Sequence, residues 1–113
     1  SLFRVEIEGD WETIGMEYTF AAALERLPGE SAYFVCFVPK EIAREIDAVT
    51  EGLRAGFGSV RIRARLGDSD WRTSIFRDAK RCSYLMLVKK EVRSAELLEE
   101  GDLLRLTIEL VDF

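Results

Sequence analysis

The sequence contains no histidine, and this absence excludes several kinds of chemistry. Ser-His-Asp and Cys-His catalysis, imidazole metal sites and the commonest general acid–base are all removed. Cysteine is also scarce: Cys36 and Cys82 are the only two, and they show no metal-binding spacing. Nothing beside either thiol indicates an activated nucleophile. We therefore expect two reduced structural cysteines, no metal and no cofactor. A non-catalytic protein is favoured, with an enzyme kept as an alternative.

Long apolar runs are missing as well. No stretch approaches the roughly 18 apolar residues of a membrane-spanning helix, and the N-terminus shows no secretory signal pattern. With 113 residues, 48% hydrophobic and 33% charged, the chain suits one globular domain over residues 1–113. We expect a soluble, cytoplasmic protein. Met16 is a candidate natural start, so residues 1–15 are either an extra N-terminal strand or a segment added to the natural chain.

Positive charge is scarce at both ends and concentrated in the middle. Residues 54–93 hold eleven basic and four acidic side chains, residues 1–53 hold four and eleven, and residues 94–113 hold one and six. The simpler interpretation is that antiparallel neighbours pair arginine with carboxylates across a sheet. The alternative is an anion-binding surface made by the middle third. We favour pairing, because the flanks hold enough carboxylates to neutralise the stretch.

Alternating hydrophobicity predicts a β-rich chain. The clearest strand is residues 59–66, where apolar side chains alternate with Arg61, Arg63 and Arg65. Six more strands are predicted over residues 2–8, 16–27, 32–38, 71–76, 83–88 and 103–113. Turns are predicted at residues 9–10, 28–31 and 67–70, and helices over 39–53 and 89–98. The predicted fold is mostly β, a small barrel of about seven strands with two short helices.

One segment of the chain has an echo 50 residues later. "FVCFVPKEIAREI", residues 34–46, aligns with "YLMLVKKEVRSAE", residues 84–96. Both read as apolar strand, basic residue and short helix. This shared order indicates a pseudo-duplicated barrel, whereas the simpler alternative is that any strand-to-helix junction looks alike.

The middle and end of the chain resemble a small bacterial and archaeal domain of unknown function. That domain occurs alone or fused to YdeI-type bacteriocin-protection (OmpD-associated) domains. The shared pattern is carried by Gly56 to Val60, Trp71, Thr73 to Phe76, Tyr84, Val88 to Lys90, Val92, Arg93, Gly101 and Asp102. Two departures stand out, because the pattern has proline where this chain has Arg77 and Leu87.

The resemblance implies a double-split β-barrel, the fold of AbrB- and MazE-like regulators and antitoxins. It implies no biochemical activity, because none is established for the family. By fold-level analogy alone, a regulator that binds nucleic acid is an alternative function.

The best candidate site is a pocket for a phosphate or carboxylate at residues 89–93. Lys89, Lys90 and Arg93 lie at a strand end and helix start, where anions are favoured. Thr73 and Ser74 would add hydroxyl donors if their strand lies beside this junction. The simpler alternative is that the lysines are solvated and Arg93 pairs with Glu96 or a turn carboxylate.

Two other features have structural and functional interpretations. Trp71 is a core residue or a platform for ligand stacking. Arg61, Arg63 and Arg65 are salt-bridged or follow a nucleic-acid backbone, and the net charge of −5 favours the first. We predict a non-catalytic module that binds a small anionic ligand or a protein partner, with nucleic acid and membrane not expected. A small-molecule enzyme using the lysine, arginine and hydroxyl cluster is a further alternative, and a homo-oligomer is left open.

Overall fold

The structure, a computed structural model, describes residues 4–6, 12–14, 16–29, 33–50 and 58–111. Within these residues the chain is mostly β, as predicted. The strands are β1 (Arg4–Glu6), β2 (Glu12–Ile14), β3 (Glu17–Ala23), β4 (Glu25–Leu27), β5 (Tyr33–Phe37), β6 (Ser59–Leu66), β7 (Ser69–Asp78), β8 (Ser83–Leu87) and β9 (Leu103–Leu110). The helices are α1 (Lys40–Thr50) and α2 (Lys90–Ala95). No described helix is long and apolar enough to cross a membrane.

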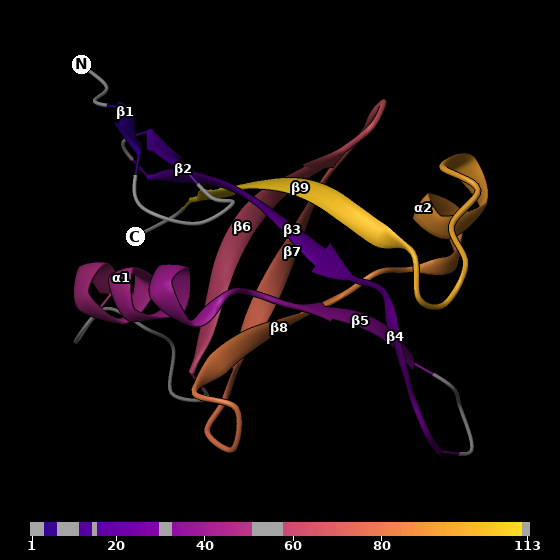
Figure 1. Cartoon of the computed structure of the whole chain (residues 1–113), viewed down its shortest axis with the longest axis horizontal. Helices are drawn as coiled ribbons and strands as arrows, with labels where there is room; N and C mark the ends of the chain where they lie inside the picture. The colour runs from indigo at the N-terminus through magenta and orange to yellow at the C-terminus, as the bar shows by residue number, and fades with distance from the viewer. Residues whose placement is uncertain (1–3, 7–11, 15, 30–32, 51–57, 112–113) are drawn as a thin grey trace.

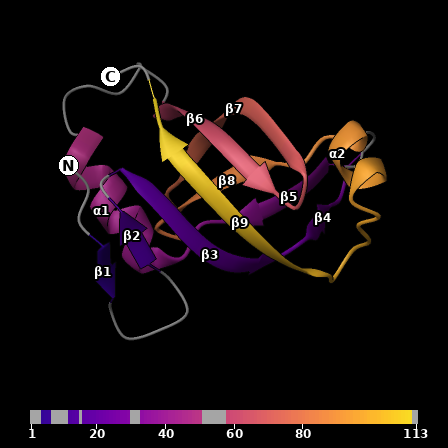
Figure 2. The same cartoon turned by 90° about the horizontal axis from the view of Figure 1, so that it is seen from above.

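All the strands pair antiparallel in one sheet, in the order β1-β2-β3-β9-β6-β7-β8-β5-β4. The sheet curls around an apolar core, and the two helices lie at its opposite ends (Figures 1 and 2). β3 and β4 stand far apart in this order, although only Leu24 separates them along the chain. One long stretch of chain therefore pairs with β9 through β3 and with β5 through β4.

β6 forms over the residues predicted for the clearest strand. Its apolar side chains, such as Ile62, are buried, while its three arginines are exposed. Burying a side chain of this size stabilises the fold by about 1.5–3 kcal/mol. Gly67 then turns the chain with a φ of +58°, a conformation that favours glycine. Because two residues complete the hairpin, Ser69 and Asp70 begin β7 and are not part of the turn.

The helices close the two ends of the core. α1 buries Ile42 and Ile46 on one apolar face, as its periodicity predicts. α2 buries Val92 and ends three residues earlier than predicted. It ends there because Leu97 adopts a φ of +56°, and the amide of Leu98 donates back to the carbonyl of Arg93.

Two strand predictions differ from the structure. The predicted strand over 16–27 is divided at Leu24, whose backbone leaves the ladder to bond with Gly101 and Asp102. β2 was not predicted, because three residues are too few for a periodic pattern and the strand forms by pairing with β3. The turn at residues 9–10, part of the turn at 28–31, the last residues of the helix predicted over 39–53, and Gly56 lie outside the described residues.

β5 and β8 pair around a centre that matches the echo in sequence. Cys36 lies directly opposite Met86, the residue aligned with it in that echo. The amide of Val38 donates to the carbonyl of Tyr84, and the amide of Val88 donates to that of Phe34. The two hydrogen bonds are equivalent under the alignment: Val38 corresponds to Val88, and Tyr84 corresponds to Phe34. The pairing of β5 with β8 is therefore symmetric about its centre. Each strand is followed, after two residues, by a helix.

Candidate functional site

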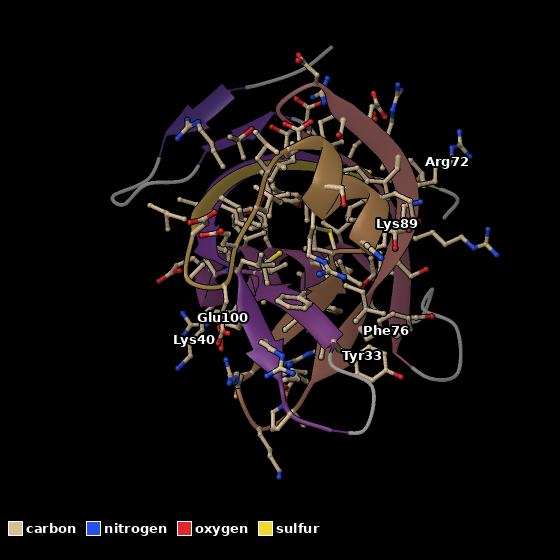
Figure 3. The ribbon with its side chains drawn as sticks, turned by 90° about the vertical axis from the view of Figure 1, so that its right-hand side faces the viewer. Tyr33, Lys40, Arg72, Phe76, Lys89 and Glu100 are labelled. Carbon is tan, nitrogen blue, oxygen red and sulfur yellow. The ribbon has the colours of Figure 1, made fainter. Side chains whose placement is uncertain are left out.

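The predicted basic group lies where β8 passes into α2. Lys89 and Lys90 are exposed, and Lys89 projects outward in Figure 3. Arg93 is half-buried: its Nε donates to the carbonyl of Val88 at 3.1 Å, and its guanidinium lies 4.0 Å from the centre of the Phe34 ring. Arg93 therefore stacks on the Phe34 ring and donates to the Val88 carbonyl. It does not form the alternative ion pair with Glu96.

The two predicted hydroxyl residues lie on β7 beside a different pair of basic residues. Thr73 and Ser74 line a hollow of about 280 Å³, together with Arg61, Ile62, Arg72 and Val111. Ser74 stands directly across from Arg61 in the β6–β7 ladder, and Arg72 stands across from Arg63. Arg61, Arg72 and Ser74 therefore share the outward face of this hairpin. We call the hollow lined by these three residues the basic hollow.

Two of the three arginines of the β6 stripe are paired, as predicted. Arg63 holds Asp70 with two hydrogen bonds of 2.8 Å, and Arg65 lies 3.0 Å from Glu17. The hydrogen bond from Arg63 is the main reason why the pKa of Asp70 is lowered. These pairs neutralise one end of the stripe and leave Arg61 at the other.

Basic side chains on this side of the molecule lack a carboxylate partner among the described residues. In the part of the chain that the structure describes, no carboxylate lies within ion-pair distance of Arg61, Arg72 or Lys89. Arg72 and Lys89 project on the same side of the molecule in Figure 3. Guanidinium groups present forked donors that match carboxylate and phosphate oxygens. The arrangement can bind an anionic group.

The aromatic residues nearby divide between core and surface. Trp71 is half-buried, stands across from Ala64, and packs against the core. Phe76 and Tyr33 are 41% and 54% exposed, and both point outward in Figure 3. Trp71 therefore packs against the core, one of its two predicted roles, whereas Phe76 on β7 and Tyr33 on β5 are exposed.

A second polar cluster fixes α1 to the sheet. Arg77 donates to both carboxylate oxygens of Asp47, at 3.2 and 3.0 Å. The hydroxyl of Tyr84 donates to the same carboxylate at 2.6 Å, and Arg77 also donates to the carbonyls of Asp78 and Ser83. Arg77 is one of the two positions where the resemblance noted in the sequence implies proline. Arginine at this position links β7 to α1 by donating to Asp47. A proline side chain has no donor and could not make these hydrogen bonds.

A second hollow, of about 310 Å³, lies between β3, β5 and the start of α1. Two basic residues, Lys40 and Arg81, line it. The guanidinium of Arg81 lies 3.8 Å from the centre of the Phe37 ring and 3.4 Å from Glu25. One of the two cations of this hollow is therefore already paired.

Buried ionisable groups are held in their neutral forms. Burial, with a smaller contribution from Glu25, raises the pKa of Cys36 to about 12. Burial, with a smaller contribution from Glu45, raises the pKa of Tyr18 to about 12. Cys82 is exposed. Among the described residues, no three Cys, Asp or Glu side chains gather in a way that could hold a metal ion.

Arg72 is the site residue that the sequence reasoning missed. The strand "WRTSIF" alternates, so Arg72, Ser74 and Phe76 share one face. The length of the hairpin turn sets the register of β7 on β6, and this register decides which residues of β7 lie beside Arg61. The predicted site took its basic residues from the helix junction, whereas the structure brings Thr73 and Ser74 to the arginines of the hairpin.

Comparison with known proteins gives one family. The model of a domain described as "Domain of unknown function (DUF1905)" matches residues 20–108. This agrees with the resemblance to a domain of unknown function that the motifs indicated. A search of curated proteins finds no match.

Proposed function

This chain belongs to the DUF1905 family, and we propose that it is a non-catalytic binding module that recognises an anionic group at the basic hollow. This proposal rests on which arginines of the β6–β7 hairpin form ion pairs with carboxylates. Arg63 and Arg65 are neutralised by carboxylates, while Arg61 and Arg72 face the same hollow without one in the described part of the chain.

The geometry suits a carboxylate or a phosphate. Arg61 and Arg72 come from neighbouring strands of a regular hairpin, so their Cα positions are fixed before a ligand arrives. Two guanidinium forks can share the oxygens of one anion, and the Ser74 hydroxyl can donate a further hydrogen bond. Lys89, on the same side (Figure 3), adds a positive charge that attracts the ligand.

Binding is favoured over catalysis by how the polar residues are used. Arg93 is held by Phe34 and Val88, so the cluster proposed for an enzyme is not assembled at one point. Following a nucleic-acid backbone would need a run of available cations, and two of the three arginines on β6 are paired with carboxylates.

We further propose that the barrel is of the double-split type and arose from two related halves, as in AbrB-like proteins. The first half would be β3–β4, β5, α1 and β6, and the second would be β7, β8, α2 and β9. The symmetric pairing of Cys36 with Met86 supports this. So does the pairing of β6 with β9, the strands that follow α1 and α2. Leu24, which joins β3 to β4 at the far end of the strand order, would close the barrel.

Titration tests the proposed function. Inorganic phosphate, glutarate and citrate would be titrated into the isotope-labelled protein, with amide chemical shifts as the readout. We expect shifts centred on residues 61 and 72–74, and a loss of affinity of about tenfold or more in Arg61→Gln and Arg72→Gln, since a charge-assisted hydrogen bond contributes about 1.5–3 kcal/mol. Arg44→Gln, an exposed arginine on α1, is the matched control. Absence of binding by the unaltered protein would overturn the proposal.

A further inference from the structure

The outward face of β7, β8 and β5 carries an apolar patch beside the basic hollow. Cys36 stands opposite Met86, Met86 stands opposite Ile75, and all three side chains are buried in the core. Because side chains alternate in direction along a strand, the next residue of each strand and every second one beyond it face outward. The most exposed apolar side chains of that outward face are Phe76, Leu87 and Tyr33, at 41%, 38% and 54%.

These three side chains run diagonally across adjacent strands. Phe76 stands opposite Leu85, and Leu87 lies two residues away from Leu85 on β8. Leu87 stands opposite Val35, and Tyr33 lies two residues away from Val35 on β5. Strands lie about 4.8 Å apart and alternate residues about 6.6 Å apart, so each step is about 8 Å and the line is about 16 Å long.

The line of exposed side chains lies on an apolar base. Val35 is fully buried although it faces outward, and it lies outside the core cluster of the described residues. It is therefore part of an apolar patch that is separate from the core. Phe37, the next outward residue of β5, is covered by the guanidinium of Arg81, 3.8 Å from the centre of its ring. The open part of the patch is therefore the diagonal line.

Basic side chains follow one side of this line. Arg61 stands opposite Ser74, and the register of the β7–β8 ladder, continued by one residue, brings Leu87 beside Ser74. The same register brings Lys89 beside Arg72. Both of these cations project on the side of the molecule where the two exposed rings point outward (Figure 3). The surface therefore changes from apolar to basic within about one strand spacing, or about 5 Å.

We infer that an amphipathic helix of a partner protein docks on this patch, with acidic side chains along one side of its apolar stripe. The inference rests on the proposed function, because it takes the anionic group at the basic hollow to be a carboxylate of this helix. A line of about 16 Å matches about 11 residues, or three turns, of helix. An apolar centre with aromatic rings and arginine beside it is typical of protein interfaces.

A helix suits this surface better than an extended segment does. β8 pairs with β7 on one side and with β5 on the other, so the backbone beneath the patch is already hydrogen-bonded. A segment laid across the face gains no main-chain hydrogen bonds from it. Its own backbone groups must therefore be satisfied internally, as they are in a helix.

Two other occupants fit the patch less well. A single-stranded nucleic acid stacks its bases on aromatic rings, whereas the middle of this line is the aliphatic pair of Leu87 and Val35, and the chain carries a net charge of −5. A second copy of this chain offers no free amphipathic helix in its described parts. Its two helices bury their own apolar side chains in the core, namely Ile42, Ile46 and Val92.

The test uses the whole chain and a fluorescent probe peptide of sequence LEALEAQLEALEAQL, whose leucines form one helical stripe with glutamates along one side. We expect it to bind, to become more helical by circular dichroism, and to shift the amide resonances of residues 33, 76 and 87. Phe76→Ala, Leu87→Ala and Arg72→Gln should each weaken binding about fivefold or more, which is the usual effect of truncating a central interface residue.

The controls separate the patch from general stickiness. Leu103 is 75% exposed on β9, which is not a neighbour of β7, β8 or β5, so Leu103→Ala should change the affinity less than about twofold. The charge-reversed peptide LKALKAQLKALKAQL should not bind. The peptide LEALEAQLEPLEAQL, in which one proline breaks the helix, should not bind either. Phe76→Ala should keep its affinity for glutarate, because Phe76 does not line the basic hollow.

The outcomes also separate this inference from the proposed function. If glutarate binds at the basic hollow but the peptide does not bind, or binds Phe76→Ala and Leu87→Ala unchanged, helix docking is overturned and the anion site stands. If the peptide binds and requires Phe76, while glutarate does not bind and Arg72→Gln has no effect, the proposed function and the acidic partner both fall. If neither glutarate nor the peptide binds, both proposals fall.

Two further results would identify a different occupant. Equal binding of the proline peptide would overturn the helix. Tighter binding of a labelled oligothymidine strand than of the peptide, with shifts at the same residues, would identify nucleic acid as the occupant and would overturn the partner protein.

Discussion

The Tyr84 hydroxyl donates a hydrogen bond of 2.6 Å to Asp47, while the equally buried Tyr18 hydroxyl has no hydrogen-bond partner among the described residues. Both rings belong to the core. The bond from Tyr84 joins β8 to α1 in the cluster that includes Arg77. Within the described part of the chain, the same functional group is therefore hydrogen-bonded at one site and without a partner at the other.

This contrast predicts opposite effects of one substitution. Tyr84→Phe should lower the free energy of unfolding by about 1–2 kcal/mol, because it removes a bond to a charged acceptor. Tyr18→Phe should leave stability unchanged or raise it by up to about 1 kcal/mol, because it removes a buried hydroxyl that has no partner among the described residues. Urea denaturation measures both. A clear loss of stability in Tyr18→Phe would show that its hydroxyl has a partner.

A side chain at Gly67 is expected to be strained by the backbone conformation and to displace the Glu96 carboxylate, which lies against it. A Cβ on Gly67 would stand 1.9 Å from the Oε1 atom of Glu96, and the backbone has a φ of +58°. Glu96 is held there by a 2.7 Å hydrogen bond from Ser69. Gly67→Ala should cost about 2–3 kcal/mol, mostly from backbone strain, with a smaller contribution from moving the Glu96 carboxylate away from Ser69.

Gly101 is the matched control for this prediction. Its φ is +91°, but nothing lies within 4 Å of an added Cβ. Gly101→Ala should therefore show the backbone effect alone, about 1–2 kcal/mol. Adding Glu96→Ala to Gly67→Ala should recover part of the lost stability. Equal losses at the two glycines would show that the contact with Glu96 contributes nothing.

The fold was largely predictable where one strand carries a regular pattern. β6 alternates over its full length, so its buried and exposed faces follow from the side chains alone. The echo of residues 34–46 in residues 84–96 matches two strand-to-helix junctions in the structure. β2 and the break at Leu24 were not predictable, because both depend on pairing with distant residues: β2 with β3, and Leu24 with residues 101–102.

The candidate site was predictable in its residue types but not in their grouping. Pairing of Arg63 and Arg65 was predicted from charge balance, although nothing local identifies Glu17 as a partner. The grouping of Ser74 with Arg61 depends on the hairpin register, which places them directly opposite each other. A turn of two residues, and not four, sets that register.

Thiol labelling should distinguish the two cysteines. Cys36 is fully buried and burial raises its pKa to about 12, so almost none of it is thiolate near neutral pH. Cys82 is exposed. At pH 8 we expect a disulfide reagent to modify one thiol rapidly in the native protein and the second only after denaturant is added. Rapid loss of both thiols without unfolding would contradict the burial of Cys36.

The carboxyl of Asp70 should titrate below its ordinary pKa because Arg63 donates to both of its oxygens. A lowered pKa in the folded state means that the pair stabilises the protein above the unfolded pKa, and that this contribution is lost as pH falls through the folded value. In Arg63→Gln, the pKa of Asp70 should return toward the ordinary value. Carbon-13 titration of the side-chain carboxyl measures it, and Arg65→Gln, which removes a weaker influence, should change it less.

Arg93 should contribute to stability and not to anion binding. Its guanidinium lies 4.0 Å from the centre of the Phe34 ring and its Nε donates to the carbonyl of Val88, so it ties α2 to β5 and β8. Arg93→Gln should lower the free energy of unfolding by about 1–2 kcal/mol, through lost cation–π and hydrogen-bond contacts. The affinity of the Arg93→Gln variant for glutarate should stay within about twofold of that of the unaltered protein. Loss of a ligand contact worth about 1.4 kcal/mol would instead weaken binding about tenfold.

Arg72→Gln should show the reverse, with weaker binding and little change in stability, because the Arg72 side chain is exposed and has no ion pair in the described chain. Urea denaturation and glutarate titration of the two variants, measured side by side, separate the two roles. If Arg93→Gln instead weakened glutarate binding as much as Arg72→Gln does, the anion site would have to extend from the hairpin to α2.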